Sequence, residues 1–145
     1  MRKVNILTTE LELSSARAGY RWRGAAVGEA AGGEQVGAFL YVLEDGERSA
    51  PYRFHHGSEH WLLVVAGSPV LRTPTGERTL RSGDLACFPA GARGAHQVTG
   101  PGTVVLLSQR SELDAIEYPD SGKIELRPTG AIFRSGDAVG FWEGE

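Results

Sequence analysis

The sequence predicts an all-β protein, a jelly-roll barrel of short antiparallel strands. Eight short apolar runs follow one another at hairpin spacing between residues 36 and 108, and turn-forming residues separate them. No segment has a convincing amphipathic helix pattern. The 20 glycines are about twice the usual share and are spread along the chain. Together these observations favour a globular protein with many tight turns.

A chain of 145 residues is long enough for one domain with a real core. We expect three parts: an N-terminal arm (1–35), a barrel core (36–110) and a C-terminal tail (111–145). In the arm, the run ILTTELEL (6–13) predicts a short edge strand, and 25–33 is too rich in glycine for a secure helix.

The barrel strands follow in chain order. The run VGAFLYVL (36–43) is β-branched and aromatic, and the turn signal EDGE follows it, so it predicts the first barrel strand. The remaining predicted strands are 51–56, 60–66, 69–73, 77–81, 85–89, 95–99 and 103–108. Glycine, proline, serine and aspartate fill the turns between them, as tight turns require.

The tail contains Pro, Asp and Gly at intervals that predict extended segments and turns. It also holds more apolar groups than a free tail would, namely Tyr118, Ile124, Leu126, Ile132, Phe133, Phe141 and Trp142. We therefore expect it to pack on the outside of the barrel or on a partner subunit, in a structural role.

Charge and cysteine content exclude several classes of function. The net charge is −3 and the arginines are scattered, so no basic stripe for nucleic acid is present. Cys87 is the only cysteine, which excludes an intrachain disulfide and a Cys-rich zinc site; we expect it to be a small buried filler. No signal-peptide core or membrane-length apolar run occurs, so a cytoplasmic protein without a membrane partner is predicted.

All four histidines lie within one 42-residue window, as His55, His56, His60 and His96. His55, His60 and His96 have spacings that can bring them together inside a small barrel, where neutral imidazole is a common ligand for Zn, Fe, Cu or Ni. Side chains alternate along a strand, so His56 faces away from His55, and we expect it at the surface or in an interface.

Two segments resemble the paired motifs of the cupin superfamily, G-x5-H-x-H-x(3,4)-E-x6-G and G-x5-P-x-G-x2-H-x3-N. They are PYRFHHGSEHWLLVVAG (51–67) and GDLACFPAGARGAHQV (83–98), and the resemblance covers about 36–110. In the second motif Gly83, Pro89, Gly91 and His96 fit, with two extra residues before His96 and Gly100 where Asn is expected.

In the first motif, Gly67 sets the register. The family's glutamate ligand then falls on His60, its second histidine on His55 and its first histidine on Arg53. Two of the four usual ligand positions are therefore altered. Glu59, one place earlier, is an alternate ligand because the family tolerates either spacing, although the Gly67 register favours a place at the rim.

The tail motifs YPDSGK, FRSGDAV and FW extend the resemblance to a bacterial group of single-domain cupins of the cupin-2 conserved-barrel type. The resemblance implies a cupin-type double-stranded β-helix with an N-terminal arm and an extended C-terminal tail. It does not imply an activity, because this barrel hosts dioxygenases, isomerases, epimerases, decarboxylases and ligand-sensing domains.

The resemblance leads to one main hypothesis for the site. His55, His60 and His96 form a three-histidine face, similar to that of thiol dioxygenases in the superfamily, for a divalent Fe, Ni, Mn or Zn ion. Arg53, which cannot ligate a cation, holds a substrate carboxylate beside the metal. The protein would then act on, or bind, a small anionic molecule in a dioxygenase-like or isomerase-like manner; no catalytic residue is assigned.

Two alternatives to a metal site remain open from the sequence. The barrel can be free of metal and bind an anion through Arg53 and protonatable imidazoles, as a non-catalytic small-ligand-binding or sensing module. Metal-free sugar epimerisation needs a His and Tyr pair, and the sequence does not say whether Tyr41 or Tyr52 faces the pocket. A homodimer is expected because jelly-roll barrels expose edge strands.

Overall fold

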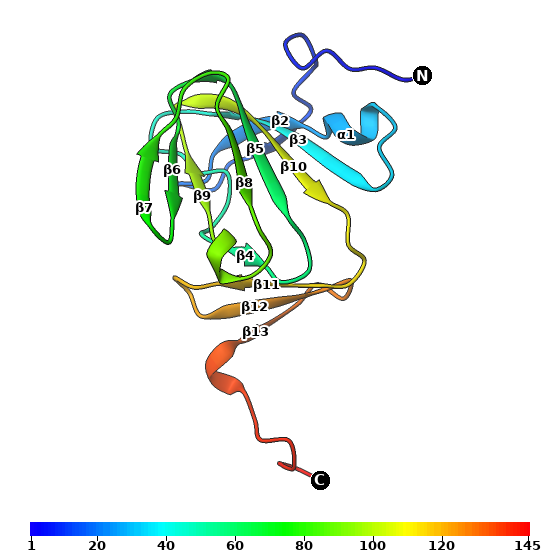
Figure 1. The fold of residues 1–145 in the computed structure, drawn as a ribbon, viewed down its shortest axis with the longest axis vertical. Coiled ribbons are helices and arrows are strands. Elements are labelled where there is room, and N and C mark those ends of the chain that lie inside the picture. The colour runs from blue at the N-terminus through cyan, green and yellow to red at the C-terminus, as the bar shows by residue number, and fades with distance from the viewer.

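The computed structural model describes all 145 residues, and nearly all of its regular structure is β (Figure 1). The arm contains β1 (Leu13–Ser15), β2 (Trp22–Ala25) and α1 (Val27–Ala30). The central region contains β3 (Val36–Leu43), β4 (Phe54–His55), β5 (His60–Gly67), β6 (Val70–Thr73), β7 (Gly76–Thr79), β8 (Leu85–Phe88), the 3-10 turn η1 (Ala92–Gly94), β9 (Gln97–Thr99) and β10 (Gly102–Gln109). The tail contains β11 (Asp114–Tyr118), β12 (Lys123–Arg127), β13 (Ala131–Arg134) and the 3-10 turn η2 (Ser135–Asp137).

The strands form three antiparallel sheets that wrap around a common interior. Their orders are β1-β2-β3-β10-β5-β8, β13-β12-β11-β4 and β7-β6-β9. Crossovers between strands distant in the chain, such as β10 between β3 and β5, are those of a jelly roll rather than of a simple meander. The predicted all-β barrel is confirmed, and each predicted barrel strand overlaps an observed one.

Alternation along the central strands separates two apolar clusters. Leu62, Val64 and Val104 face the barrel interior and are fully buried there with their neighbours. Leu40 and Val105 point to the opposite face of the same sheet. The N-terminal arm covers that second face, so the sheet is buried on both sides.

The arm differs from the prediction in two ways. Residues 6–12 form no strand, because Ile6 and Leu11 pack their side chains flat against the outer sheet face instead of pairing at its edge. A short helix, α1, occurs where none was expected. It lies so close to β3 that a Cβ at Gly28 would come within 2.4 Å of the backbone nitrogen of Ala38, so glycine here permits the packing rather than preventing the helix.

The tail closes one end of the barrel. β11 pairs with β4, with Ile116 opposite His55, and β12 and β13 add to its outer edge (Figure 1). Ile116 is almost fully buried, so the inner face of this sheet belongs to the barrel interior. Beyond β13 the chain leaves the barrel and extends away from it (Figure 1).

Cys87 is exposed, which corrects the expectation of a buried filler. Its neighbour Phe88 takes the inward position on β8, so alternation turns the Cys87 side chain outward, opposite Trp61. None of the helices is both long enough and apolar enough to span a lipid bilayer.

Candidate functional site

Three of the four histidines meet inside the barrel. His55 ends β4, His60 begins β5 and His96 precedes β9, and all three are buried. The ring centroids of His55 and His60 are 3.9 Å apart, and those of His60 and His96 are 5.7 Å apart. Two backbone hydrogen bonds between Arg53 and His96, of 3.2 and 2.9 Å, join the two motif segments.

The longer loop before His96 holds its imidazole in place. Nδ1 of His96 donates to the carbonyl oxygen of Gly94 at 2.8 Å, which leaves Nε2 as the free ring nitrogen. Gly94 is required here because a Cβ would lie 1.8 Å from the carbonyl oxygen of Pro89. The ring also stacks on Phe88, with centroids 3.9 Å apart and planes 8° apart. The lengthened loop therefore contains the 3-10 turn η1, whose Gly94 carbonyl fixes the ring.

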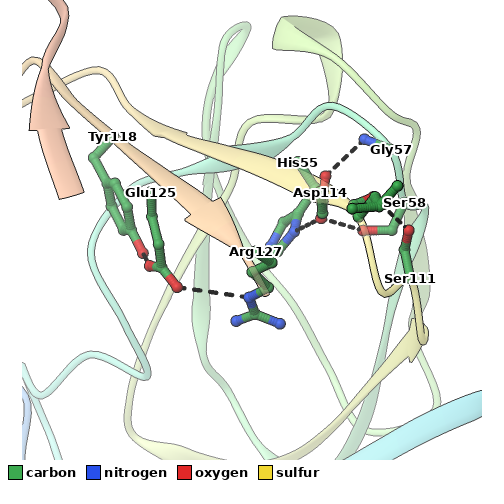
Figure 2. A network of polar contacts seen from close by, with 9 residues as sticks. His55, Gly57, Ser58, Ser111, Asp114, Tyr118, Glu125 and Arg127 are labelled. Atoms are coloured by element: carbon green, nitrogen blue, oxygen red, sulfur yellow. Dashed lines mark hydrogen bonds and ion pairs between the residues drawn. The ribbon is translucent and has the colours of Figure 1, made fainter. Parts of the chain in front are cut away.

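His55 is held by Asp114, which lies 59 residues later in the chain (Figure 2). Nδ1 of His55 lies 2.7 Å from Oδ2 of Asp114, which also accepts the Ser58 hydroxyl at 2.9 Å. The other carboxylate oxygen accepts the Gly57 backbone N–H at 2.8 Å. With Nδ1 committed to the acid, Nε2 of His55 is buried without a hydrogen-bond partner. Nε2 therefore carries a lone pair that is free to bind a ligand.

Sequence reasoning missed Asp114. It lies outside both motifs, in a tail that was expected to be only structural, and a single aspartate in a turn-rich segment gives no signal of its own. Only the pairing of β11 with β4 brings it beside His55.

Burial keeps the imidazoles neutral. It lowers the pKa of His60 to about 3, and the neighbouring imidazoles and Arg53 add to that effect. It lowers the pKa of His96 to about 4, against the opposing hydrogen bond to Gly94. The pKa of His55 is also lowered by burial, although Asp114 opposes the shift. At neutral pH the site presents three uncharged nitrogen donors.

Asp114 is ionised. Burial by itself would raise the pKa of its carboxyl group, but hydrogen bonds from His55, Gly57 and Ser58 lower it below its usual value. The buried pair therefore consists of a carboxylate and a neutral imidazole whose Nδ1–H points at it.

A cavity of about 290 Å³ opens beside His60, whereas His55 and His96 do not line it. His60 and Arg53, which occupy the two altered ligand positions, lie in its wall. The full lining is Ala26, Glu29, Gly37, Ala38, Phe39, Tyr41, Arg53, His60, Leu106, Ser108, Arg110 and Arg127. Three arginines against one carboxylate make this cavity cationic.

The three arginines differ in whether an acidic side chain neutralises their charge. Arg53 makes no ion pair with any acid, and its buried Nε has no hydrogen-bond partner. Arg110 reaches across the rim to Glu29 at 2.9 Å. Arg127 lies 3.6 Å from Glu125, which in turn accepts the Tyr118 hydroxyl at 2.6 Å (Figure 2). The deepest arginine is thus the one with unsatisfied hydrogen-bonding capacity.

The remaining predicted residues lie elsewhere. Tyr41 lines the cavity, whereas Tyr52 lines a different one. Glu59 is exposed and accepts the Trp61 indole N–H at 2.7 Å, on the outer side of β5. His56 is exposed and pairs with Glu117 at 2.7 Å, as the alternation of side chains predicted.

Whether these residues suit a metal depends on donor type and on position. Three neutral imidazoles match the donor chemistry of Zn, Fe or Ni sites. One of them, His55, is oriented by a carboxylate and has its other ring nitrogen free, as metal-binding histidines do. As the side chains lie, no group of three or more His, Cys, Asp or Glu residues is placed to hold a metal ion. The three imidazoles therefore fit a metal by donor type, but their side chains would have to move to coordinate one.

Comparisons with known proteins agree with this architecture. A family model described as a cupin domain matches residues 39–109. A candidate sugar phosphate isomerase from Acidithiobacillus ferrooxidans is 25% identical, with a TM-score of 0.82, and the match covers 95% of this chain and 93% of that one.

Two further solved structures extend the comparison. A sugar phosphate isomerase of the cupin superfamily from Silicibacter pomeroyi is 25% identical over 94% of each chain, with a TM-score of 0.81. A cupin-like protein from Thermotoga maritima, 18% identical with a TM-score of 0.60 over 77% of this chain and 86% of that one, shares the fold. No curated protein matches the sequence.

Proposed function

The chain belongs to the cupin superfamily, and from that premise we propose that its barrel cavity binds and isomerises a small phosphorylated or carboxylated sugar. The observation that most directly supports this proposal is the cationic cavity in which Arg53, without an acidic partner, lies beside His60. A half-buried guanidinium whose Nε is buried without a hydrogen-bond partner favours an anionic ligand that can satisfy it.

The size and charge of the cavity favour a small anion. At about 290 Å³ it lies at the lower end of ordinary ligand pockets. Arg53 would take a phosphate or carboxylate deep in the cavity, and Arg110 and Arg127 would neutralise it nearer the rim. A planar guanidinium binds two oxygens of either group at once, which orients the ligand as well as holding it.

The groups beside the arginines suit proton transfer at a carbonyl compound. Tyr41 keeps its proton because burial raises the pKa of its hydroxyl, although Arg53 acts in the opposite direction. Neutral His60 can exchange a hydrogen bond with a carbonyl or hydroxyl oxygen, as uncharged imidazole does at other isomerase sites. This pair supplies the tyrosine partner that the sequence alone did not identify, and two similar structures are named as sugar phosphate isomerases.

A second candidate adds a divalent transition metal, and the free Nε2 of His55 favours it. His55, His60 and His96 would hold the ion, and Asp114 would orient His55 toward it. When bound, the ion would polarise a substrate carbonyl or phosphoryl oxygen as a Lewis acid.

The anion proposal is tested by calorimetric titration with inorganic phosphate, followed by ³¹P NMR with aldose and ketose phosphates of five and six carbons. We expect Arg53→Ala to weaken phosphate binding about tenfold or more. Arg81→Ala, an exposed arginine outside the cavity, should leave it unchanged. Equal affinity in wild type and Arg53→Ala would contradict the proposal. Binding without interconversion of any sugar would favour the sensing module over the isomerase.

The metal candidate is tested by elemental analysis of untagged protein and by Co²⁺ titration, in which absorption bands report ligand type. The expected result is about one ion per chain in the wild type and in His56→Ala, and loss of the ion in the combined His55→Ala, His60→Ala and His96→Ala variant. Because that variant removes three buried groups, a single His60→Gln variant checks the result in a less disturbed barrel. No ion in the wild type, even after reconstitution, would contradict the metal candidate and leave the anion site.

A further inference from the structure

The end of the chain carries a concentrated apolar surface that its own barrel does not cover. Residues 138–145 make hydrogen bonds only among themselves, and they extend away from the barrel (Figure 1). Phe141 and Trp142 are 85% and 78% exposed, and their rings contact each other edge to face with centroids 4.7 Å apart. Two exposed aromatic rings on a segment with no partner indicate an interaction surface.

The exposed apolar groups continue from this segment onto the sheet that closes the barrel. The set consists of Leu126, Phe133, Val139, Phe141 and Trp142, whereas Ile132 points to the other face of the same sheet. At roughly 100–200 Å² for each side chain, the five offer about 600 Å² per chain. A reciprocal contact between two chains would bury about 1,200 Å², at the lower end of the range for a stable specific interface. The patch is therefore large enough for a second copy of the chain.

A second cavity of this chain has complementary chemistry. It measures about 470 Å³ and lies between the beginning of β2, the segment before β4 and the β11–β12 turn. Its lining includes three aromatic residues, Tyr20, Trp22 and Tyr52, and two cations, Arg17 and Lys123. The only acid in the lining, Asp120, is already paired with Arg72 through two contacts of 2.6 and 2.9 Å.

The tail matches this cavity in both charge and shape. From residue 135 onward it contains Asp137, Glu143 and Glu145 and no basic residue. Its paired aromatic rings can pack edge to face against the aromatic lining of the cavity, while its carboxylates face Arg17 and Lys123.

The tail and the cavity also meet at one turn. The Ser135 backbone N–H donates to the carbonyl oxygen of Gly122 at 2.9 Å, and the neighbours of Gly122 on both sides line the cavity. A two-fold axis close to this turn would bring each tail to the cavity of the other chain and close the assembly at two copies.

We propose that residues 135–145 form an exchange arm, which docks in the Tyr20, Trp22 and Tyr52 cavity of a second copy and makes the protein a reciprocal homodimer. The proposal does not depend on the reaction in the barrel. It assigns a role to the tail motif and to the larger cavity, neither of which the catalytic proposal uses.

The test is the molar mass of the full chain by sedimentation equilibrium over a micromolar concentration series. We expect a dimer, and at least a tenfold weaker association for the combined Phe141→Ala and Trp142→Ala variant. Lys123→Glu, which places a like charge in the cavity, should also weaken association. Leu85→Ala removes an exposed apolar side chain from the far edge strand β8 and serves as the matched control, with no change expected.

A dye-labelled peptide of residues 135–145 tests the docking site directly. We expect it to bind the monomeric Phe141→Ala and Trp142→Ala protein, whose cavity is vacant, and to bind less tightly when Lys123→Glu is added. A wild type that stays monomeric at about 100 μM would overturn the proposal, because a dimer with a micromolar dissociation constant would be almost fully formed at that concentration. A dimer indifferent to the tail variants, or a peptide indifferent to Lys123→Glu, would overturn it as well.

Discussion

Two consecutive histidines each pair with an acid on β11, and the two pairs differ mainly in their surroundings. His55 lies 2.7 Å from Asp114 and His56 lies 2.7 Å from Glu117. The first pair is buried, with side chains 5% and 3% exposed, whereas the second pair is 48% and 35% exposed. Alternation along the chain places the two pairs on opposite faces of one sheet.

The difference shows what burial adds to a simple His–carboxylate contact. At the surface, water competes for both partners, so the His56 pair contributes little and leaves the ring free to move. Inside the barrel, the Gly57 amide and the Ser58 hydroxyl also bind Asp114, and His55 has one orientation with a free Nε2. Only the buried pair can hold an imidazole ready for a ligand.

The largest expected effect is a loss of folding stability in acid, caused by the buried histidines. The folded-state pKa values of His60 and His96 are about 3 and about 4, below the unfolded value near 6.5, so the unfolded chain binds more protons. The free energy of unfolding therefore has its full value above pH ~6.5. It falls as the pH decreases, by about 1.4 kcal/mol per pH unit for each proton taken up on unfolding. Asp114, whose folded pKa is also lowered, loses its contribution below pH ~4.

Urea unfolding of chelator-treated protein between pH 7 and pH 4 measures this loss, which should amount to several kcal/mol. His60→Gln should show a shallower dependence, because it removes one group that protonates only on unfolding. A pH-independent free energy of unfolding would show that these imidazoles are not desolvated as described.

Removing the buried acid should have the next largest effect. Asp114→Ala leaves the Gly57 amide, the Ser58 hydroxyl and the His55 ring nitrogen without their acceptor, so we expect a loss of about 3 kcal/mol in the free energy of unfolding. Urea unfolding at pH 7 provides the measurement. A loss below about 1 kcal/mol would mean that water replaces the carboxylate and that the site is wetter than its burial indicates.

Exchanging the acid for its amide should have a smaller effect on stability and a clear one on the ligand. Asp114→Asn keeps the size and some hydrogen bonds, so we expect a loss of about 1–2 kcal/mol in the free energy of unfolding. If a metal binds, its affinity should fall about 10–100-fold, because the amide no longer fixes the His55 tautomer. Co²⁺ titration measures the metal affinity, and an unchanged value would show that Asp114 does not orient His55 for the metal.

The exposed pair should have the smallest effect. We expect His56→Ala and Glu117→Gln each to change the free energy of unfolding by less than about 0.5 kcal/mol, and to leave phosphate and Co²⁺ binding unchanged. The same titrations measure both. An effect comparable to that of Asp114→Asn would show that the two faces of the sheet do not differ in function.

Local patterns in the chain are sufficient for the barrel strands. Runs such as 36–43 and 60–66 combine β-branched or aromatic residues with turn signals, so their structure depends on residues that are near in sequence. The arm was harder to predict, because Ile6 and Leu11 pack on a sheet face that only the folded barrel creates. A pattern of apolar residues does not say which surface they will cover.

The sequence by itself determined the all-β barrel and the face that Arg53 shares with His55, because strand propensity and side-chain alternation are local properties. The resemblance to the cupin motifs added the expectation that His55, His60 and His96 lie close together. Only the tertiary structure decided that Asp114 holds His55, that Tyr41 rather than Tyr52 lines the site, and that Arg110 and Arg127 complete its charge. These residues come from strands and loops far apart in the chain. Sheet pairing brings them together, and no local pattern encodes which distant strand will lie beside the histidines.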